Sequence, residues 1–500
     1  MNSLHLAGIC LIVLLLSSCV SARYNPDSKL APQAMISDAR LAKDTYFKNH
    51  PALDWYSPAA EVAQAFADLE NGLTDSLTEP QFRLKLGKAM ATIHCGHTSN
   101  LSSRKRDRYV KKYKYADWHF PLHMRCFGDS MVVTNNLRGS QSAIVPGDAI
   151  VAINGQMAGR IIDSLLLHIP GDGTSNAGPR YLLSRSFPAY YTGVYGKADR
   201  YIVDYIDKAG HFKTDTLAPL PATSTRMQRQ RDTARAQRRP APPAKKPEVK
   251  KITLLRNFRI DTARHAGIME LNTFSPARLK SFFRQSFREM RLNELEHLVL
   301  DLRNNGGGRI QNSTRLTRYL ALQPFTVCDT LAARDLVLHR SRYVPFGFFY
   351  PVMQLFFPKK EDGRYHFAKY PNRHFQPRKK NHFNGNVFVI TSGRTYSAST
   401  LFLGAIVDQP NVTVIGEETG GGAYGNSSTL LPEMRLPHTG VRIRIPLFRC
   451  VIDADLPKNG RGILPDHWVI PGSFEIRNRI DAKMKKALDL VDEAGHRQSK

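Results

Sequence analysis

Ser397 stands where a serine could act as a nucleophile. It follows a predicted buried strand, VFVIT (387–391), and a turn at Gly393, and it precedes a predicted helix that starts at about Ala398. The strand prediction rests on a β-branched and aromatic run, and the helix prediction on the spacing of small and apolar residues. A hydroxyl at this corner would lie beside unpaired backbone N–H groups and the positive end of a helix dipole. The alternative interpretation is that Ser397 only caps the helix.

A second stretch, HLVLDLRNNGGGR (297–309), reads as a strand that ends in three consecutive glycines and leads into a helical pattern. Glycines without a Cβ let backbone amides approach a ligand closely, as an oxyanion hole requires. A plain tight turn or a phosphate-binding loop is the alternative, but no Gly-Lys-Ser/Thr follows to complete a nucleotide site. The alternation of strands and helices in this half predicts an α/β fold with a mainly parallel sheet covered by helices.

The stretches DLRNNGGG and TYSASTLFLGAI resemble the tail-specific, or C-terminal processing, serine proteases, whose relatives include the core peptidase of tricorn. The resemblance continues through VTVIGEETGGG (412–422) and GRGILPDHWV (460–469). It implies a crotonase- or Clp-like catalytic core, protein or peptide substrates, and no metal or organic cofactor. It also implies that Ser397 is the nucleophile and that the backbone amides of Ala398 and Gly307 stabilise the oxyanion.

The general base departs from the commoner family pattern. Many members use a Ser–Lys dyad, and Gly422 stands where their lysine would be. A serine hydroxyl is too weak an acid to attack an amide unaided, so either another base exists or the site is inactive. The stretch IHCGHTSNL resembles the Gly-His-Thr element of the lysine-less branch of the family, which implies that His97 is the base. His94, three residues earlier, is a competing candidate.

The acid that would orient His97 stays open. Tricorn-like sites place a glutamate shortly before a Gly-x-x-Pro-Asp element, but this chain has Lys458 and Asn459 in that neighbourhood. The candidate acids all lie in segments that match the family: Asp408, Glu417, Glu418 and Asp466.

The N-terminus reads as an export signal. Residues 1–18 form an apolar run that is too short for a stable membrane anchor. The tetrapeptide LSSC, which ends at Cys19, resembles the lipobox of bacterial lipoproteins and implies a lipid-anchored protein of the cell envelope, on the periplasmic or the surface side. An ordinary cleaved signal is the alternative, and it would also export the protein.

Composition shifts and motifs divide the chain into parts. The capping-box pattern Thr78-Glu-Pro-Gln81 marks a helix start, and IVPGDAIVAINGQMAG resembles the second half of a PDZ domain, which binds an extended peptide at a sheet edge or serves as a packing module. The expected order is a signal peptide (1–18), a tether (19–31), a helical region (32–114), a PDZ-like domain (115–215), a disordered basic proline-rich insertion (216–251), a catalytic domain (252–480) with an aromatic and basic insertion (336–384), and a C-terminal helix or tail (481–500).

The formal net charge of +28 is concentrated in segments 226–251 and 336–384. No nucleic-acid module accompanies it, so anionic lipids or anionic envelope polymers are the expected charged partners. The cysteines after Cys19 are widely scattered, which makes a metal site improbable and leaves any disulfide pairing open. The sequence therefore predicts a membrane-tethered serine endopeptidase of the cell envelope. The alternative is a catalytically inactive peptide-binding or scaffold protein with the same fold.

Overall fold

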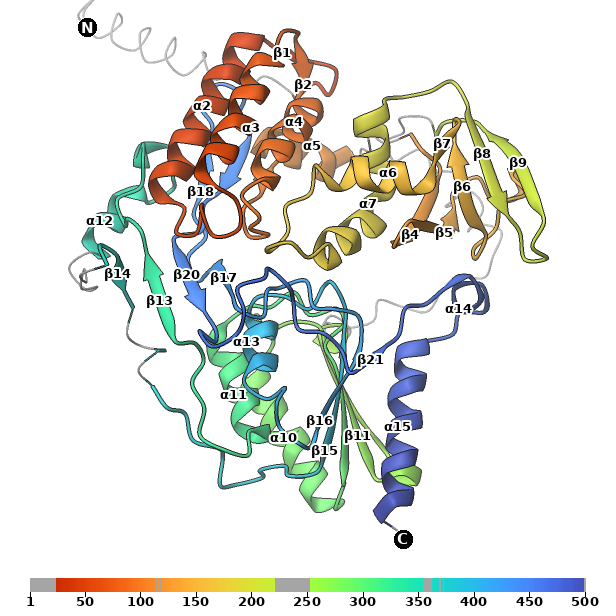
Figure 1. Cartoon of the computed structure of the whole chain (residues 1–500), viewed down its shortest axis with the longest axis vertical. Coiled ribbons are helices and arrows are strands. Elements are labelled where there is room, and N and C mark those ends of the chain that lie inside the picture. The colour runs from red at the N-terminus through yellow and green to blue at the C-terminus, as the bar shows by residue number, and fades with distance from the viewer. Residues whose placement is uncertain are drawn as a thin grey trace, which may run out of the picture.

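The structure is a computed structural model that describes residues 24–113, 116, 119–220, 252–353, 362–367, 370–371 and 373–498. An N-terminal group of helices and a β-rich module lie side by side above a larger α/β part (Figure 1). The expected signal peptide, Cys19 and most of the expected disordered insertion lie outside the described residues. Among the helices of the described part, none has both the length and the apolar character needed to cross a membrane.

The α/β part is built on a six-stranded sheet. Its strands, in spatial order, are β10 (Arg256–Asp261), β11 (Ala266–Leu271), β12 (His297–Asp301), β15 (Asn386–Thr391), β16 (Val412–Gly416) and β21 (His467–Trp468). β10 pairs antiparallel at one edge, and all the other pairs are parallel. The prediction of a mainly parallel sheet is therefore confirmed.

Helices cover both faces of this sheet. Val387 and Val389 of β15 pack toward α10 (Leu279–Leu292), α11 (Ile310–Leu320) and α13 (Ala398–Gly404). Phe388 and Ile390, which point the other way, pack against α15 (Ala482–Gln498). Because both sets are buried, the strand reads as a continuous apolar run rather than as an alternating pattern.

The parallel register brings two predicted site segments to one edge of the sheet. Asp301 at the end of β12 pairs with Ile390 near the end of β15. The glycine turn follows β12, and the turn to Ser397 follows β15. Since parallel strands end at the same edge, these two segments must meet there.

A second core joins the N-terminal helices to the C-terminal half. The helices α2 (Pro32–Asn49), α3 (Ala59–Asn71) and α4 (Glu79–Ala91) share buried side chains with a four-stranded sheet and a three-stranded sheet. In the three-stranded sheet, β3 (Asn100–Leu101) pairs with β19 (Arg442–Arg444). This pairing holds the segment after His97 against a strand that is more than three hundred positions later in the chain.

The β-rich module is an antiparallel sheet with its own apolar core. Its strands lie in the order β4 (Leu122–Phe127), β5 (Ser130–Asn136), β6 (Ala149–Ile153), β8 (Tyr201–Ile206) and β9 (Phe212–Leu217). Two helices, α6 (Ala158–Leu166) and α7 (Ala177–Tyr195), pack on it. Strand β9 extends to Leu217, so the first residues of the segment expected to be disordered are in fact ordered.

A local capping signal placed the start of α4 correctly. Thr78 and Gln81 form the expected capping box at α4. Pro58 is the N-cap of α3, where no side chain makes a capping hydrogen bond. Helix α13 ends at Gly404, short of the apolar pattern that continues to Ile406.

One buried ion-pair cluster links three parts of the chain. Lys483 on α15 is 4% exposed, and its Nζ lies 2.7 Å from Glu417 Oε1 and donates to the Thr391 carbonyl at 2.7 Å. Arg125 of β4 also pairs with Glu417, at 2.5 Å. Burial lowers the pKa of Lys483 to about 8, while Glu417 opposes that shift.

We expect Glu417→Gln to lower the free energy of unfolding by about 3–5 kcal/mol, because it leaves the buried Lys483 without its anionic partner. Urea titration measures this change. The control is Asp489→Asn on α15, the helix that carries Lys483. It breaks the surface pair with Lys485 and should lower the free energy of unfolding by less than about 1 kcal/mol. Equal losses in the two variants would contradict the structural role given to the cluster.

Candidate active site

Ser397 lies between β15 and α13 in a strained backbone conformation, with φ 58° and ψ −119°. A residue held in such a sparsely populated backbone conformation costs free energy, and conformations of this kind cluster at active sites. Ser397 takes the N-cap position of α13, but its side chain makes no capping hydrogen bond. The hydroxyl is therefore not used to cap the helix, which weighs against the plain N-cap interpretation.

Two glycines lie directly against Ser397. A Cβ placed on Gly307 would be 2.8 Å from Ser397 Cβ and 3.0 Å from the Ala398 nitrogen. A Cβ on Gly421 would be 3.2 Å from the Ser397 nitrogen. Gly307 also has φ 93°, a conformation that side chains disfavour. Backbone atoms rather than side chains therefore line the space beside the serine.

The two expected oxyanion donors lie together but differ in their present bonding. Ala398 is the first residue of α13, so its N–H is one that the helix itself leaves unpaired. The Gly307 N–H donates to Asn305 Oδ1 at 3.0 Å. Asn305 is fully buried, and its carbonyl accepts from the Tyr396 N–H and the Ser399 hydroxyl. Gly307 can donate to an oxyanion only after it exchanges this partner.

His97 lies next to Tyr396, the residue that precedes Ser397. Its imidazole centroid is 5.0 Å from the ring centroid of Tyr396. A side chain on Gly96 would overlap the Tyr396 hydroxyl, so the glycine before His97 makes this approach possible. Thr98, on the other side, is buried and pairs with His50 Nε2 at 3.0 Å. The competing candidate His94 has φ 51°, and its carbonyl accepts from the Gly173 N–H.

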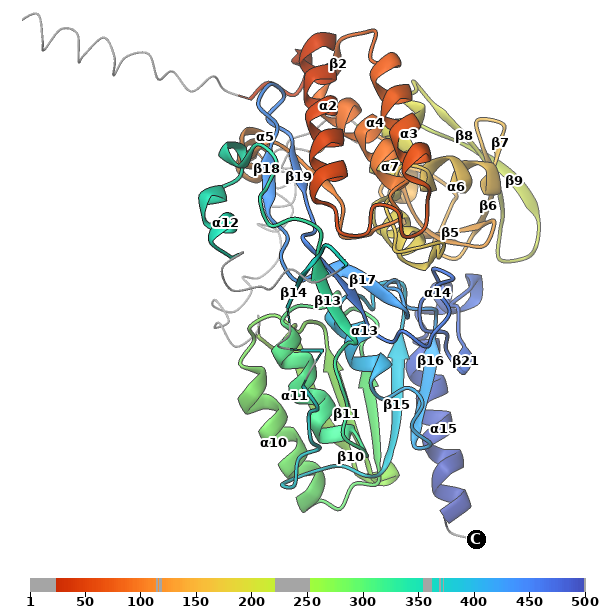
Figure 2. The ribbon, with the colours of Figure 1, turned by 60° about the vertical axis from the view of Figure 1, so that its left-hand side comes forward.

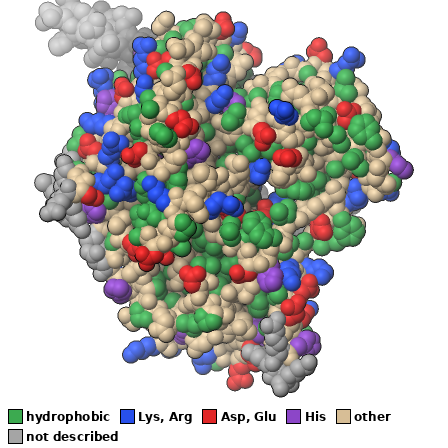
Figure 3. Space-filling model, in the orientation of Figure 1, with side chains coloured by type: hydrophobic (Ala, Val, Ile, Leu, Met, Phe, Trp, Pro, Cys, Tyr) green, Lys and Arg blue, Asp and Glu red, His purple; other side chains and the backbone are tan. Residues whose placement is uncertain are grey.

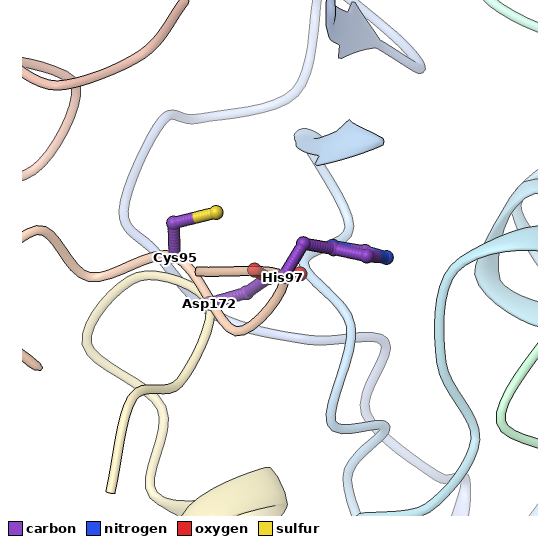
Figure 4. A group of neighbouring side chains, drawn as sticks. All are labelled: Cys95, His97 and Asp172. Carbon is purple, nitrogen blue, oxygen red and sulfur yellow. The ribbon is translucent and has the colours of Figure 1, made fainter. Parts of the chain in front are cut away.

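A carboxylate that sequence reasoning missed lies beside His97. Asp172, in the loop between α6 and α7, is 4% exposed and accepts from the Gly96 N–H at 2.8 Å. A ring nitrogen of His97, a carboxylate oxygen of Asp172 and the Cys95 sulfur all lie within 4.8 Å of one another. Figure 4 shows these three side chains, with the His97 ring extending away from the Cys95 thiol.

Several polar atoms in this group lack partners. His97 Nδ1, Asp172 Oδ2 and the Tyr396 hydroxyl are buried and have no hydrogen-bond partner among the described residues. Buried polar groups are seldom left unpaired, so this group of three stands out in the site. Both His97 and the Tyr396 hydroxyl interact with the Asp172 carboxyl and oppose the rise that burial causes in its pKa.

The loop that carries Asp172 is held from both sides. The Gly173 N–H donates to the His94 carbonyl at 2.9 Å, and Thr174 and Ser175 donate to the Gly460 carbonyl. Gly173, at φ 63°, packs so closely on Gly460 that a Cβ would overlap it. The only sequence signal was an aspartate between two glycines after a proline, which marks a turn rather than a catalytic group.

The four acids proposed from the sequence are engaged elsewhere or exposed. Glu417 pairs with Arg125 and Lys483, as described above. Glu418 pairs with Arg461 at 2.8 Å. Asp466 accepts a hydrogen bond from the Val414 N–H at 2.7 Å, and Asp408 is exposed to solvent. The described acid that lies beside His97 is Asp172 instead, because tertiary packing rather than family position decides which carboxylate is near.

The electrostatics favour a neutral imidazole. Burial lowers the pKa of His97 below its usual value, Asp172 opposes this shift, and Arg444 adds to it. Burial raises the pKa of Asp172, and His97 opposes that shift. At neutral pH the imidazole is therefore neutral, with a proton on only one ring nitrogen, which is the form that a general base needs.

Cys95, His97 and Asp172 have the donor types of a metal site, but their chemistry fits one poorly. Burial raises the pKa of the Cys95 thiol to about 12, whereas a metal ligand must be a thiolate. One Asp172 oxygen is already committed to the Gly96 amide. The other described cysteines, at positions 126, 328 and 450, are buried free thiols.

Comparisons with known proteins bear on the fold and on the family. The solved structure of mature CPAF complexed with lactacystin matches with a TM-score of 0.62 and 12% identity, over 93% of this chain and 97% of its own. A second structure of mature CPAF matches with a TM-score of 0.60 and 12% identity, over 92% and 96%. At this identity the match shows the fold alone, and it confirms the expected fold class. No curated protein matches the sequence.

A family model gives the more specific result. The model described as Peptidase family S41 matches residues 265–469, which include β11, the glycine turn and Ser397. The predicted class of serine-type peptidase is therefore confirmed. Residues 265–469 thus match the model of peptidase family S41, and S41 is a family of serine proteases.

Proposed function

We propose that this chain is a membrane-tethered serine endopeptidase of the cell envelope that cleaves protein or peptide substrates through an acyl-enzyme. The observation that carries the proposal is the convergence of segments that are distant in sequence. The imidazole of His97 lies against Tyr396, the strained Ser397 follows it, and the glycine turn lies against Ser397.

The proposed reaction begins with attack of Ser397 Oγ on the scissile carbonyl while His97 accepts the hydroxyl proton. The Ala398 N–H holds the resulting oxyanion, and the Gly307 N–H joins it after leaving Asn305. When the C–N bond breaks, His97 returns the proton to the leaving amine, and the acyl group stays on Ser397. Water, deprotonated by His97, then attacks the ester, which releases the acid and restores the serine.

Asp172 is the proposed positioning residue for His97. Its unpaired Oδ2 can accept from a protonated Nδ1 and so fix which ring nitrogen faces Ser397. The carboxylate would also stabilise the imidazolium that forms during the reaction.

Asp172→Asn is expected to lower kcat by about 10³–10⁴-fold. It should also move the acid limb of the kcat/KM profile to lower pH, because the Asp172 charge raises the pKa of His97. In the unmodified protein that limb should lie below the usual histidine value, since activity falls as pH drops through a lowered pKa. Asp408→Asn, at an exposed acid, serves as the control and should change neither quantity. A lower kcat with an unmoved acid limb would contradict the positioning role.

A fluorophosphonate probe tests the proposed chemistry directly. The full-length protein should form a one-to-one adduct, and peptide mapping should place it on Ser397. The Ser397→Ala variant should remain unlabelled. A properly folded protein that is not labelled and cleaves no protein substrate would favour the inactive peptide-binding alternative.

The proposed tether depends on Cys19, which lies outside the described residues. Supporting it are the short apolar run and the LSSC sequence that ends at Cys19. Cells grown with a clickable fatty acid should label the protein, and Cys19→Ala should abolish that label. Retention of the label in this variant would contradict a lipid anchor at Cys19.

A further inference from the structure

Helix α5 (Arg104–Tyr113) is a strongly basic surface element. Its sequence, RKRDRYVKKY, carries six Lys and Arg against one Asp, and none of its residues is buried. The single acid, Asp107, is itself paired with Arg442 at 2.6 Å, so it does not offset the cations of the helix. This helix lies in neither of the two segments in which the sequence concentrates its positive charge.

The first residue that the structure describes lies against this helix. The ring centroid of Tyr24, the first described residue, lies 5.5 Å from that of Tyr109 on α5. Tyr109 in turn lies 4.7 Å from Tyr113. Cys19 is five positions before Tyr24, and five residues of fully extended chain span at most about 17 Å. A lipid on Cys19 would therefore enter its membrane within that distance of Tyr24 and its contact on α5.

Exposed apolar side chains lie near the same edge. Phe346 directly precedes η4 (Gly347–Phe349), Phe349 ends η4, and Val352 lies in α12 (Tyr350–Met353). Their side chains are 73%, 56% and 47% exposed, in that order. This segment follows η3 (Ser341–Tyr343), which contacts β18 (Glu433–Arg435). β18 pairs with β19, whose Arg442 reaches α5.

These elements share one side of the molecule. Figure 2 shows α5, β18 and α12 along the upper left margin, with α10 lower down, toward the bottom of the protein. In Figure 3, Lys and Arg side chains gather along the upper left margin of the view, on the side where α12 lies in Figure 1, whereas α5 lies nearer the middle of that view. Cations beside exposed aromatic side chains are the combination that holds proteins on anionic bilayers.

We propose that α5 and the η4–α12 edge form a docking face for the anionic headgroups of a lipid bilayer. The cations of α5 attract the negatively charged surface, and Phe346 and Phe349 insert between the headgroups. This inference rests on the proposed tether only for which side of the protein meets the membrane. The docking face itself would bind lipid without the acyl chains. It fixes how the peptidase lies on the membrane, in addition to keeping it there.

The experiment uses the unlipidated chain that begins at Val20, which keeps every described residue. Its binding is measured by co-sedimentation with vesicles of phosphatidylcholine alone or with 30% phosphatidylglycerol added. Lys105, Arg108 and Lys112 are changed together to Gln. Since each cation near an anionic surface contributes about a fivefold factor, binding to the anionic vesicles should fall about 100-fold.

A second triple variant is the matched control. Lys280, Arg284 and Arg288 are exposed on one face of α10, so changing them to Gln removes the same charge from the far end of the molecule. This variant should lose less than threefold in binding. Equal losses in the two variants, or equal binding to neutral and anionic vesicles, would overturn the proposal.

Two further readouts separate lipid from other possibilities. Phe346→Ser with Phe349→Ser should weaken vesicle binding at least fivefold without changing the binding of soluble polyphosphate. If these changes leave vesicle binding intact, α5 recognises soluble polyanions rather than a bilayer, and the proposal fails. Hydrolysis of a soluble peptide should be unchanged in the α5 variant, so a failure of docking remains distinct from a failure of the proposed peptidase function.

Discussion

Ser397→Ala is expected to lower kcat by about 10⁵–10⁶-fold with little change in KM. The substitution removes the attacking oxygen but leaves the glycine turn and the Ala398 amide in place, so substrate binding should persist. Turnover of an unfolded protein substrate, followed by mass spectrometry, measures the effect. Alanine keeps the positive φ that serine already adopts, so the loss should not arise from a new backbone strain.

Ser399→Ala is the control for this prediction. Ser399 is two residues away, fully buried, and its hydroxyl donates to the Asn305 carbonyl at 3.0 Å. Losing that hydrogen bond should cost about 1 kcal/mol of stability and leave kcat within tenfold of the original. If Ser399→Ala abolished turnover while Ser397→Ala retained it, the nucleophile would be misassigned.

His97→Ala should lower kcat by a similar factor, about 10⁵–10⁶-fold, because the nucleophile and the base act as a unit. The double variant with Ser397→Ala should be barely worse than either single variant. Steady-state turnover is measured at pH 8, where even an unperturbed histidine is neutral. The protonation of a histidine then does not contribute to the measured loss of kcat.

His94→Ala discriminates between the two histidines. The His94 carbonyl holds Gly173 through its backbone, so this contact survives loss of the side chain. The variant should therefore keep most of its activity. Loss of turnover in His94→Ala but not in His97→Ala would reverse the assignment of the base.

Local patterns predicted the segments that carry the nucleophile. The apolar run of β15, the glycines after β12 and the start of α13 at Ala398 all lie where the sequence placed them. These features depend on side-chain periodicity and on glycine, which act over a few residues. The meeting of the glycine turn with Ser397 also follows from adjacent parallel strands, which end at one edge of the sheet.

The sequence by itself thus determined the α/β fold, the strand-to-helix corner at Ser397 and, through the family resemblance, the candidate base His97. Only the tertiary structure decided which carboxylate reaches that base and which acids are consumed in ion pairs. Asp172 lies seventy-five positions after His97 on a loop that is held by Gly460, and nothing local to it encodes that contact. Glu417 was excluded in the same way, because Arg125 and Lys483 converge on it from separate parts of the chain. Distances between groups far apart in sequence are set by the packing of whole elements, and one sequence does not contain that information in a form that periodicity or motif spacing can reveal.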